Sequence, residues 1–278
     1  MSNRLAYLGP PGTYSEQAAL DHDNEAVLLP FPSIPAAASA VDSGEADECV
    51  VPIENSLQGA VTFTLDLLIH DSMLVIRNEL VVPINHCLIV KPGANFDEIK
   101  RVYSHPQSLG QCQKFLRKRL PRAESIASMS NAKAVEDMME SSDTAAAIAG
   151  ERAASLYGGE IIERGIEDLP NNETRFVVLA HSDHPPTGLD KTSICFDFDH
   201  DSPGILYSTL GELAGRHINL LKIESRPTKQ SLGRYVFLVD IEGHRQDDTV
   251  KEALESVKSQ VAMFKIFGSY PLHVSSAI

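Results

Sequence analysis

Short apolar runs alternate with helix-like segments along most of the chain. The run at 4–8 has the length of a buried strand, and the segment 15–21 after it has a helical pattern. Ser33 can cap another helix, and Gly44 can end it. This alternation of strands and helices predicts an α/β fold. Further strands are expected at 26–30, 49–53, 81–90, 101–103, 144–149 and 160–163, with helices at 107–119, from 130, and up to 158.

A Pro-rich stretch at 184–188, His-Pro-Pro-Thr-Gly, marks the clearest boundary, because stiff prolines followed by glycine suit a linker. The pattern after it is strand, helix, strand, strand, helix, strand. That order predicts a ferredoxin-like unit, with helices on one face of an antiparallel sheet and an edge available to a second copy. Its strands are expected at 192–198, 219–225, 235–241 and 263–268, and its helices from 202 and from 248.

Composition narrows the functional class. The 278 residues carry a net charge of -14, which argues against nucleic acid as a partner, because phosphate binding needs clustered Lys and Arg. A secretory signal and a membrane-spanning run are both missing from the pattern, so no membrane partner is expected. The four cysteines are isolated in the sequence. We interpret them as reduced thiols of a cytoplasmic protein without a metal site.

Four loops at strand ends carry unusual sets of polar residues. Hydroxyls and amides dominate these loops, and Arg175 is their one fixed charge. Ligands bind at strand ends in open α/β folds, so we expect the loops to meet in a cleft between two lobes. Such a lining suits a small polyanion held by hydrogen bonds and helix N-termini, and it lacks the motifs of a hydrolase. The loops are 9–15 (Gly-Pro-Pro-Gly-Thr-Tyr-Ser), 52–56 (Pro-Ile-Glu-Asn-Ser), 104–108 (Ser-His-Pro-Gln-Ser) and 171–176 (Asn-Asn-Glu-Thr-Arg-Phe).

Together these loops resemble the motifs of the prephenate dehydratase family, and Glu-Ser-Arg-Pro at 224–227 resembles a signature of its ACT regulatory domain. The resemblance runs from about residue 5 to 270. It implies a two-lobed catalytic region of the periplasmic-binding-protein type 2 kind at 1–184, with one lobe from 1–80 and 160–184 and the other from 81–159. An ACT domain is implied at 190–278. Because the first strand begins at Arg4, the chain is expected to be the form without a chorismate mutase domain in front.

The resemblance implies conversion of prephenate to phenylpyruvate, with loss of water and carbon dioxide and without cofactor or metal. It gives Thr174 the role of hydroxyl donor to the leaving group and Arg175 that of partner to a substrate carboxylate. Phe176 would pack against the ring or support the loop. A threonine hydroxyl is a poor acid, so the proton donor stays open, and His105 is the motif residue that titrates near neutrality. The implied hydrogen-bonding shell consists of Thr13, Ser15, Asn55, Ser56, Ser104, His105 and Gln107.

The ACT domains of this family pair and bind L-phenylalanine, which implies feedback inhibition and a homodimer or homotetramer through these domains. Ile205 and Tyr207 depart from the family's pattern. The larger Tyr207 would either alter the effector pocket or face the core of its own domain. The implied effector contacts are Gly204, Leu206, Asn219, Leu220, Glu224, Ser225 and Arg226.

Two alternatives stay open on the sequence. An arogenate dehydratase performs the same chemistry on the amino analogue, whose ammonium group would need a carboxylate or carbonyl cluster. A non-catalytic, amino-acid-sensing protein with two lobes is the other, and the presence of Thr174 with its neighbouring loops argues against it.

Overall fold

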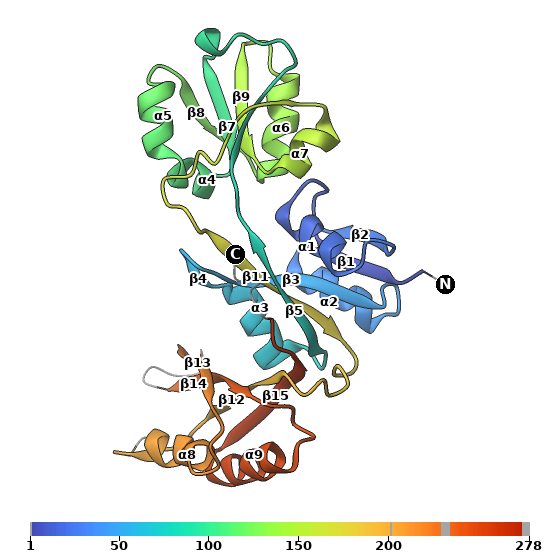
Figure 1. Ribbon diagram of the computed structural model, residues 1–278, viewed down its shortest axis with the longest axis vertical. Coiled ribbons are helices and arrows are strands. Elements are labelled where there is room, and N and C mark those ends of the chain that lie inside the picture. The colour runs from blue at the N-terminus through green and yellow to red at the C-terminus, as the bar shows by residue number, and fades with distance from the viewer. Residues whose placement is uncertain (1, 201, 229–233, 274–278) are drawn as a thin grey trace. The chain divides into compact units, whose positions relative to one another are not determined.

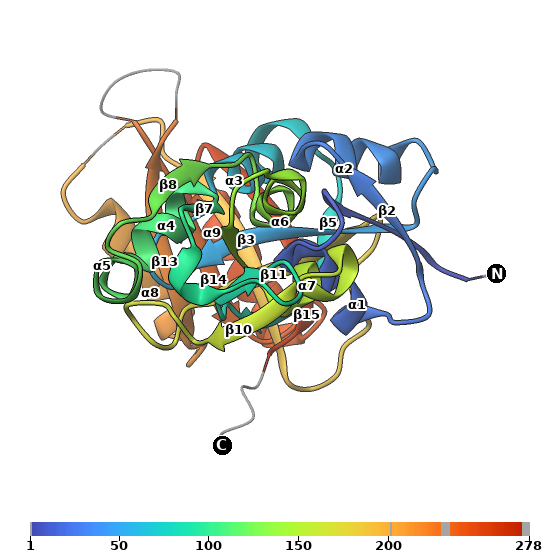
Figure 2. The ribbon, with the colours of Figure 1, turned by 90° about the horizontal axis from the view of Figure 1, so that it is seen from above.

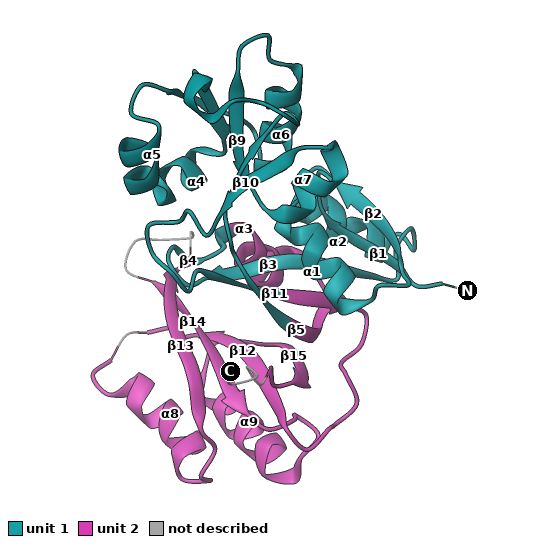
Figure 3. Ribbon diagram, turned by 45° about the horizontal axis from the view of Figure 1, so that its top comes forward, with its two compact units in different colours: residues 1–62, 80–176 teal, residues 63–79, 177–278 magenta. Residues whose placement is uncertain are grey.

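The computed structural model describes residues 2–200, 202–228 and 234–273. The chain forms two compact units, one made of 1–62 and 80–176 and the other of 63–79 and 177–278 (Figure 3). Two long strands, β5 (Val75–Pro83) and β11 (Glu173–Ala180), contribute residues to both units. Strands and helices alternate along the first unit (Figure 1), so the predicted mixed α/β class is confirmed.

The first sheet has the strand order β2-β1-β3-β11-β5, with β4 paired to β3. Strand β1 runs parallel to β2 and to β3. Helices α1 and α2 begin at caps that the sequence encodes, because the Thr13 hydroxyl accepts from the Glu16 N–H and the Ser33 hydroxyl accepts from the Ala36 N–H. The elements are β1 (Arg4–Leu8), α1 (Tyr14–His22), β2 (Val27–Phe31), α2 (Ile34–Asp42), β3 (Glu48–Asn55) and β4 (Gly59–Ala60).

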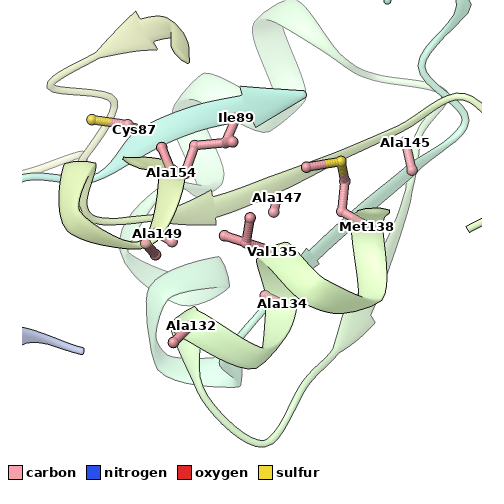
Figure 4. Packing of buried hydrophobic residues seen from close by; sticks show 11 residues of the cluster. Cys87, Ile89, Ala132, Ala134, Val135, Met138, Ala145, Ala147, Ala149 and Ala154 are labelled. Carbon is pink, nitrogen blue, oxygen red and sulfur yellow. The ribbon is translucent and has the colours of Figure 1, made fainter. Parts of the chain in front are cut away.

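The second sheet has the order β10-β6-β9-β7-β8. Every residue of β9 is buried, because side chains pack on both of its faces. Ala145, Ala147 and Ala149 face a cluster with Val135 and Met138 of α6 (Figure 4), and the alternate residues of β9 face a second cluster. The elements are β6 (Cys87–Val90), η2 (Phe96–Glu98), β7 (Arg101–Ser104), α4 (Pro106–Gln111), α5 (Gln113–Arg119), β8 (Glu124–Ala127), α6 (Asn131–Glu140), β9 (Ala145–Ala149), α7 (Glu151–Tyr157) and β10 (Glu160–Arg164).

Two sequence predictions in this region were wrong. The apolar run 81–90 is not one strand: β5 ends at Pro83 in the first sheet, and β6 begins at Cys87 in the second. Pro83 has no N–H for a ladder, and the next N–H, of Ile84, donates to the Asn172 carbonyl at 2.7 Å. The helix expected at 107–119 is broken at Cys112, whose φ of -116° and ψ of 21° are not helical.

The second unit contains an antiparallel sheet of order β13-β14-β12-β15. Helices α8 and α9 lie together on one face of this sheet (Figure 1), where they complete a core around Ile194, Phe196 and Val239. This is the strand and helix order predicted for the ferredoxin-like unit. The elements are β12 (Asp190–Asp197), α8 (Ile205–Ala214), β13 (Leu220–Pro227), β14 (Tyr235–Glu242), α9 (Asp248–Gln260) and β15 (Met263–Pro271).

The second unit also includes a segment, 63–79, that the sequence pattern did not resolve into elements. It contains most of α3 (Thr62–Asp66) and the π-helix η1 (Leu67–Asp71). Polar contacts tie it to the C-terminal sheet: Lys191 Nζ lies 2.9 Å from Glu79 Oε2, and Lys265 Nζ donates to the Ser72 carbonyl at 2.7 Å. Both side chains of the Lys191–Glu79 pair are almost fully buried.

Candidate active site

Asn55 connects the ends of β3 and β11. Its Nδ2 lies 2.9 Å from Thr174 Oγ1, 2.8 Å from Asn172 Oδ1 and 3.1 Å from the Glu173 carbonyl oxygen. Its Oδ1 accepts the N–H groups of the two residues that follow Ser56. Because Asn55 donates to Thr174 Oγ1, that oxygen acts as the acceptor in this contact. The Thr174 proton is therefore directed away from Asn55, which leaves the hydroxyl able to donate to a ligand.

Ser56 locks the same two loops together. Its N–H donates to the Glu173 carbonyl at 2.9 Å, and its hydroxyl accepts from the Glu173 N–H at 3.0 Å. Arg175, the next residue but one, presents Nη1 at 3.6 Å from Glu54 Oε2, and only 14% of its side chain is exposed. The predicted cation is thus held by a carboxylate at a distance longer than a close charge-assisted hydrogen bond.

Phe176 lies inside the first sheet and is only 2% exposed. A side chain buried to that degree belongs to the core, so the interpretation of Phe176 that fits its position is support of the loop. Thr174 and Asn55 are also buried, at 9% and 8% exposure, which holds their geometry against solvent competition.

A cavity of about 990 Å³ lies beside the 9–15 loop. Four of the predicted binding residues, Thr13, Ser15, His105 and Gln107, line it. The Thr13 hydroxyl is already committed to the turn, since it donates to the Pro10 carbonyl at 3.0 Å and caps α1. Its other lining residues are Leu8, Gly9, Pro10, Pro11, Tyr14, Pro30, Phe31, Pro32, Met129, Ser130, Asn131 and Lys133.

Ser104 lies behind this cavity. It is fully buried and donates its hydroxyl to the Ile148 carbonyl at 2.7 Å. Asn131 at the start of α6 presents Oδ1 at 2.9 Å from the Ser108 hydroxyl and 3.2 Å from the Ser104 hydroxyl. His105 accepts the Gln107 N–H through Nδ1 at 3.3 Å as the cap of α4. Ser104 therefore positions the loop, while His105 and Gln107 reach the cavity.

A polar chain that sequence reasoning missed starts at the Asn55 network. Asn172 Nδ2 lies 3.4 Å from Gln111 Oε1, which in turn lies 2.9 Å from His86 Nε2. The Tyr14 hydroxyl lies 3.3 Å from His86 Nδ1 and donates to the Asn85 carbonyl at 2.7 Å. Burial lowers the pKa of His86 and raises that of Tyr14, which favours the neutral form of both. The sequence signal was a histidine within the apolar run 81–90.

The predicted effector residues occupy two places in the second unit. Gly204 and Leu206 line a cavity of about 770 Å³ together with Tyr207. Tyr207 is 83% exposed, so the alternative that it faces its own core was wrong. The remaining predicted residues lie on or beside β13, an edge strand of its sheet. They are Asn219, Leu220, Glu224, Ser225 and Arg226.

Arg226 has a second connection. Its Nη2 lies 3.4 Å from Asp66 Oδ1 at the end of α3, and both side chains are mostly buried. The helix α3 follows the loop that carries Asn55 and Ser56 by a few residues. An effector-motif residue is thus tied to the chain segment that leads directly into the Thr174 network.

The four cysteines are free and buried, in keeping with the interpretation of them as structural thiols, and burial raises the pKa of Cys87 to about 11. Across the part of the chain that the structure describes, no three His, Cys, Asp or Glu side chains gather closely enough to hold a metal ion. Within the same described ranges, every helix is too short or too polar to span a membrane.

Comparison with known proteins identifies two family models in the chain. The model described as prephenate dehydratase matches residues 5–184, and the model described as ACT domain matches residues 200–259. A bifunctional chorismate mutase/prephenate dehydratase of Neisseria gonorrhoeae is 42% identical over 97% of this chain and 75% of its own length. A prephenate dehydratase of a Mycobacterium species (strain JLS) is 38% identical over 96% of this chain and 89% of its own length.

The fold comparison agrees with the sequence comparison. A crystal structure of prephenate dehydratase from Arthrobacter aurescens, in complex with L-Phe, superposes with a TM-score of 0.88 at 34% identity. The match covers 97% of this chain and 90% of that one. The similarity therefore extends over both units.

Proposed function

The chain belongs to the prephenate dehydratase family, and on that premise we propose that it converts prephenate to phenylpyruvate through the Thr174 network. The observation that carries the proposal is the contact between Asn55 Nδ2 and Thr174 Oγ1 at 2.9 Å. It fixes a neutral hydroxyl at a strand end with its proton available to a ligand. The enzyme is a lyase that removes water and carbon dioxide from its substrate.

The reaction needs little covalent work from the protein. The electron pair of the bond to the ring carboxylate moves into the ring as carbon dioxide leaves, and the ring hydroxyl departs with its own bonding pair as the ring becomes aromatic. Negative charge grows on the departing oxygen only as this bond breaks. A hydrogen bond from Thr174 to that oxygen stabilises the transition state more than the bound substrate.

Substrate orientation falls to the groups around this network. Arg175 would exchange its 3.6 Å contact with Glu54 for a paired carboxylate of the substrate. Ser15, His105 and Gln107 line the cavity, where they would supply hydrogen bonds to the rest of the molecule. Asn55, Ser56, Ser104 and Phe176 would hold these groups in place, and Thr13 would serve mainly as the cap of α1. His105 is the candidate for delivery of the proton that the departing oxygen finally takes up.

Feedback inhibition by L-phenylalanine is the second part of the proposal. The match to the ACT model and the similarity to a structure with bound L-Phe support it. Gly204 and Leu206 line one cavity, whereas the other predicted contacts lie along the edge strand β13. A site completed by β13 of a second copy would unite the two sets, in a homodimer or homotetramer formed through the ACT domains. The exposed Tyr207 would then stand at the mouth of the effector cavity.

Domain boundaries and location complete the proposal. We assign residues 1–184 to the catalytic region, with lobes at 1–80 with 160–184 and at 81–159, and residues 190–278 to the regulatory domain. The family-model limits at 184 and 200 support this division. The reaction belongs to amino-acid biosynthesis, and we place the protein in the cytoplasm.

The decisive experiment incubates the purified protein with prephenate and measures phenylpyruvate, with and without L-phenylalanine. A parallel reaction with arogenate tests the amino analogue, and calorimetry measures L-phenylalanine binding. The expected result is turnover of prephenate that L-phenylalanine suppresses. Binding of L-phenylalanine without turnover of either substrate would instead support the non-catalytic sensor.

A further inference from the structure

A buried carboxylate joins the two lobes of the first unit. The first lobe is the first sheet with α1 and α2, and the second lobe is the second sheet with α4 to α7. Glu16 in the first turn of α1 is 6% exposed. Its Oε2 accepts from Arg152 Nε of α7 at 3.0 Å and from the Gly12 N–H at 2.8 Å. One oxygen therefore ties a loop of the first lobe to a helix of the second, and α1 and α7 lie close together in Figures 1 and 2.

Other contacts hold the same loop against the second lobe. The Tyr157 hydroxyl at the end of α7 donates to the Pro11 carbonyl at 3.1 Å. Gly12 has a φ of 84°, and a Cβ added there would lie 3.0 Å from the Tyr157 ring and 3.3 Å from Ala132 and Ala153. The backbone of the loop thus approaches α6 and α7 as closely as a residue without a side chain allows.

The loop forms one wall of the 990 Å³ cavity, and His105, Gln107 and Asn131 of the second lobe contribute to the rest of its lining. A contact that fixes the loop relative to α7 therefore fixes the distance between these lining groups. Arg152 and Glu16 do not line this cavity themselves, so they act on a ligand only through the loop.

We propose that Glu16 and Arg152 form a clasp between the lobes that positions the 9–15 loop and sets the width of the substrate cavity. They are positioning residues for the reaction, and the inference rests on the proposed function. Glu16 raises the pKa of Arg152 through their hydrogen bond, so the pair stays ionised across the working range. Without Arg152, a carboxylate would stay buried without its cation, and the loop would separate from α7 to hydrate it.

The test is a double-mutant cycle with Glu16→Gln and Arg152→Gln. Each single variant should raise KM for prephenate about tenfold, with kcat changed less than about threefold, because the clasp favours the binding-competent width and not the chemical step. The double variant should be no worse than either single variant. Hydrogen exchange at the Gly12 amide should speed up in each, because its acceptor is weakened or released.

Arg164→Gln is the matched control, because its pair with Glu151 at 2.8 Å is exposed, with 63% and 59% of the two side chains accessible. It should leave KM and the Gly12 exchange rate unchanged. Arg152→Lys serves as a milder variant that keeps the cation, and it should give an intermediate KM. A variant that melts earlier but keeps the wild-type KM and exchange rate would show a merely structural pair and overturn the clasp.

The two proposals fail separately. If wild-type protein does not turn over prephenate, the proposed function falls, while the exchange comparison still tests the clasp. If wild-type protein is active and both single variants keep its KM, the clasp falls and the function stands. Circular dichroism identifies any variant that does not fold, and the cycle is then read from Arg152→Lys and Glu16→Gln.

Discussion

Thr174→Val is the sharpest test of the proposed mechanism. Valine has nearly the shape of threonine and replaces the hydroxyl by a methyl group, so the buried site keeps its packing. Asn55 Nδ2 would lose Thr174 Oγ1 but keep Asn172 Oδ1 at 2.8 Å and the Glu173 carbonyl at 3.1 Å, one acceptor for each of its two hydrogens. The substitution therefore strands no buried donor, and the change in rate reports on the hydroxyl itself.

The expected loss follows from where the charge develops. A hydrogen bond to a charged group contributes about 1.5–3 kcal/mol, and a single preorganised donor to a developing oxyanion changes kcat roughly 10²–10³-fold. Thr174 is 9% exposed, so water cannot easily replace its proton. We therefore expect kcat to fall about 100-fold in Thr174→Val, with KM within about threefold, because the bond strengthens only as hydroxide leaves.

The assay follows phenylpyruvate formation at several prephenate concentrations and separates kcat from KM. Thr174→Ser is the matched control, since it keeps the hydroxyl and should retain most of the wild-type kcat. L-phenylalanine binding, measured by calorimetry, should be the same in all three proteins. A Thr174→Val enzyme with kcat within a few-fold of wild type would refute the assignment of the hydroxyl to the leaving group.

Three further predictions use other parts of the structure. Asp66→Ala removes the ion pair with Arg226 and should weaken inhibition by L-phenylalanine several-fold without slowing uninhibited turnover, as a dose–response assay would show. Gly268→Ala should destabilise the protein by more than about 3 kcal/mol, because its φ of 148° is strained for alanine and the Cβ would overlap the β5 backbone, whereas Gly44→Ala, with open space around it, should cost only about 1 kcal/mol in a denaturant titration. Burial lowers the pKa of His86 below its usual 6.5, so the unfolded chain takes up this proton first as pH falls below that value, and the melting temperature should drop from pH 7 to 5 less steeply in His86→Gln than in wild type.

Local signals in the sequence were enough to predict most of the fold. Ser33 caps α2 as expected, and Gly158 ends α7 in the left-handed conformation that favours glycine. The errors arose where tertiary contacts decide the structure. Nothing in the apolar run 81–90 shows that its two halves enter different sheets, because the crossing depends on Asn172, which lies far along the chain. The segment 63–79 is likewise ordered by partners such as Lys191 and Lys265.

The site was predictable in its motifs but not in its geometry. Residues of the four loops lie either in the Thr174 network or around the cavity, as their positions at strand ends suggest. The polar groups behind them escaped detection, because His86 and Gln111 act through contacts between distant parts of the chain. Glu16 showed only as the fourth residue of a capping pattern with Thr13. Its link to Arg152 spans 136 positions, and no local pattern carries such information.

The charge distribution explains why the site depends on short-range contacts. At a net charge of -14 the protein repels a dianion at long range. The basic groups near the site face acidic partners as well: Arg175 faces Glu54, and Lys133 of the cavity pairs with Glu136 and Asp137. A substrate carboxylate must therefore displace an existing partner. The 3.6 Å contact of Arg175 is the one that a closer, paired carboxylate can replace with a gain, since charge-assisted bonds at about 2.8 Å are markedly stronger. Affinity is then generated at contact distance, where the Asn55 network and the clasp on the 9–15 loop hold the groups that make it.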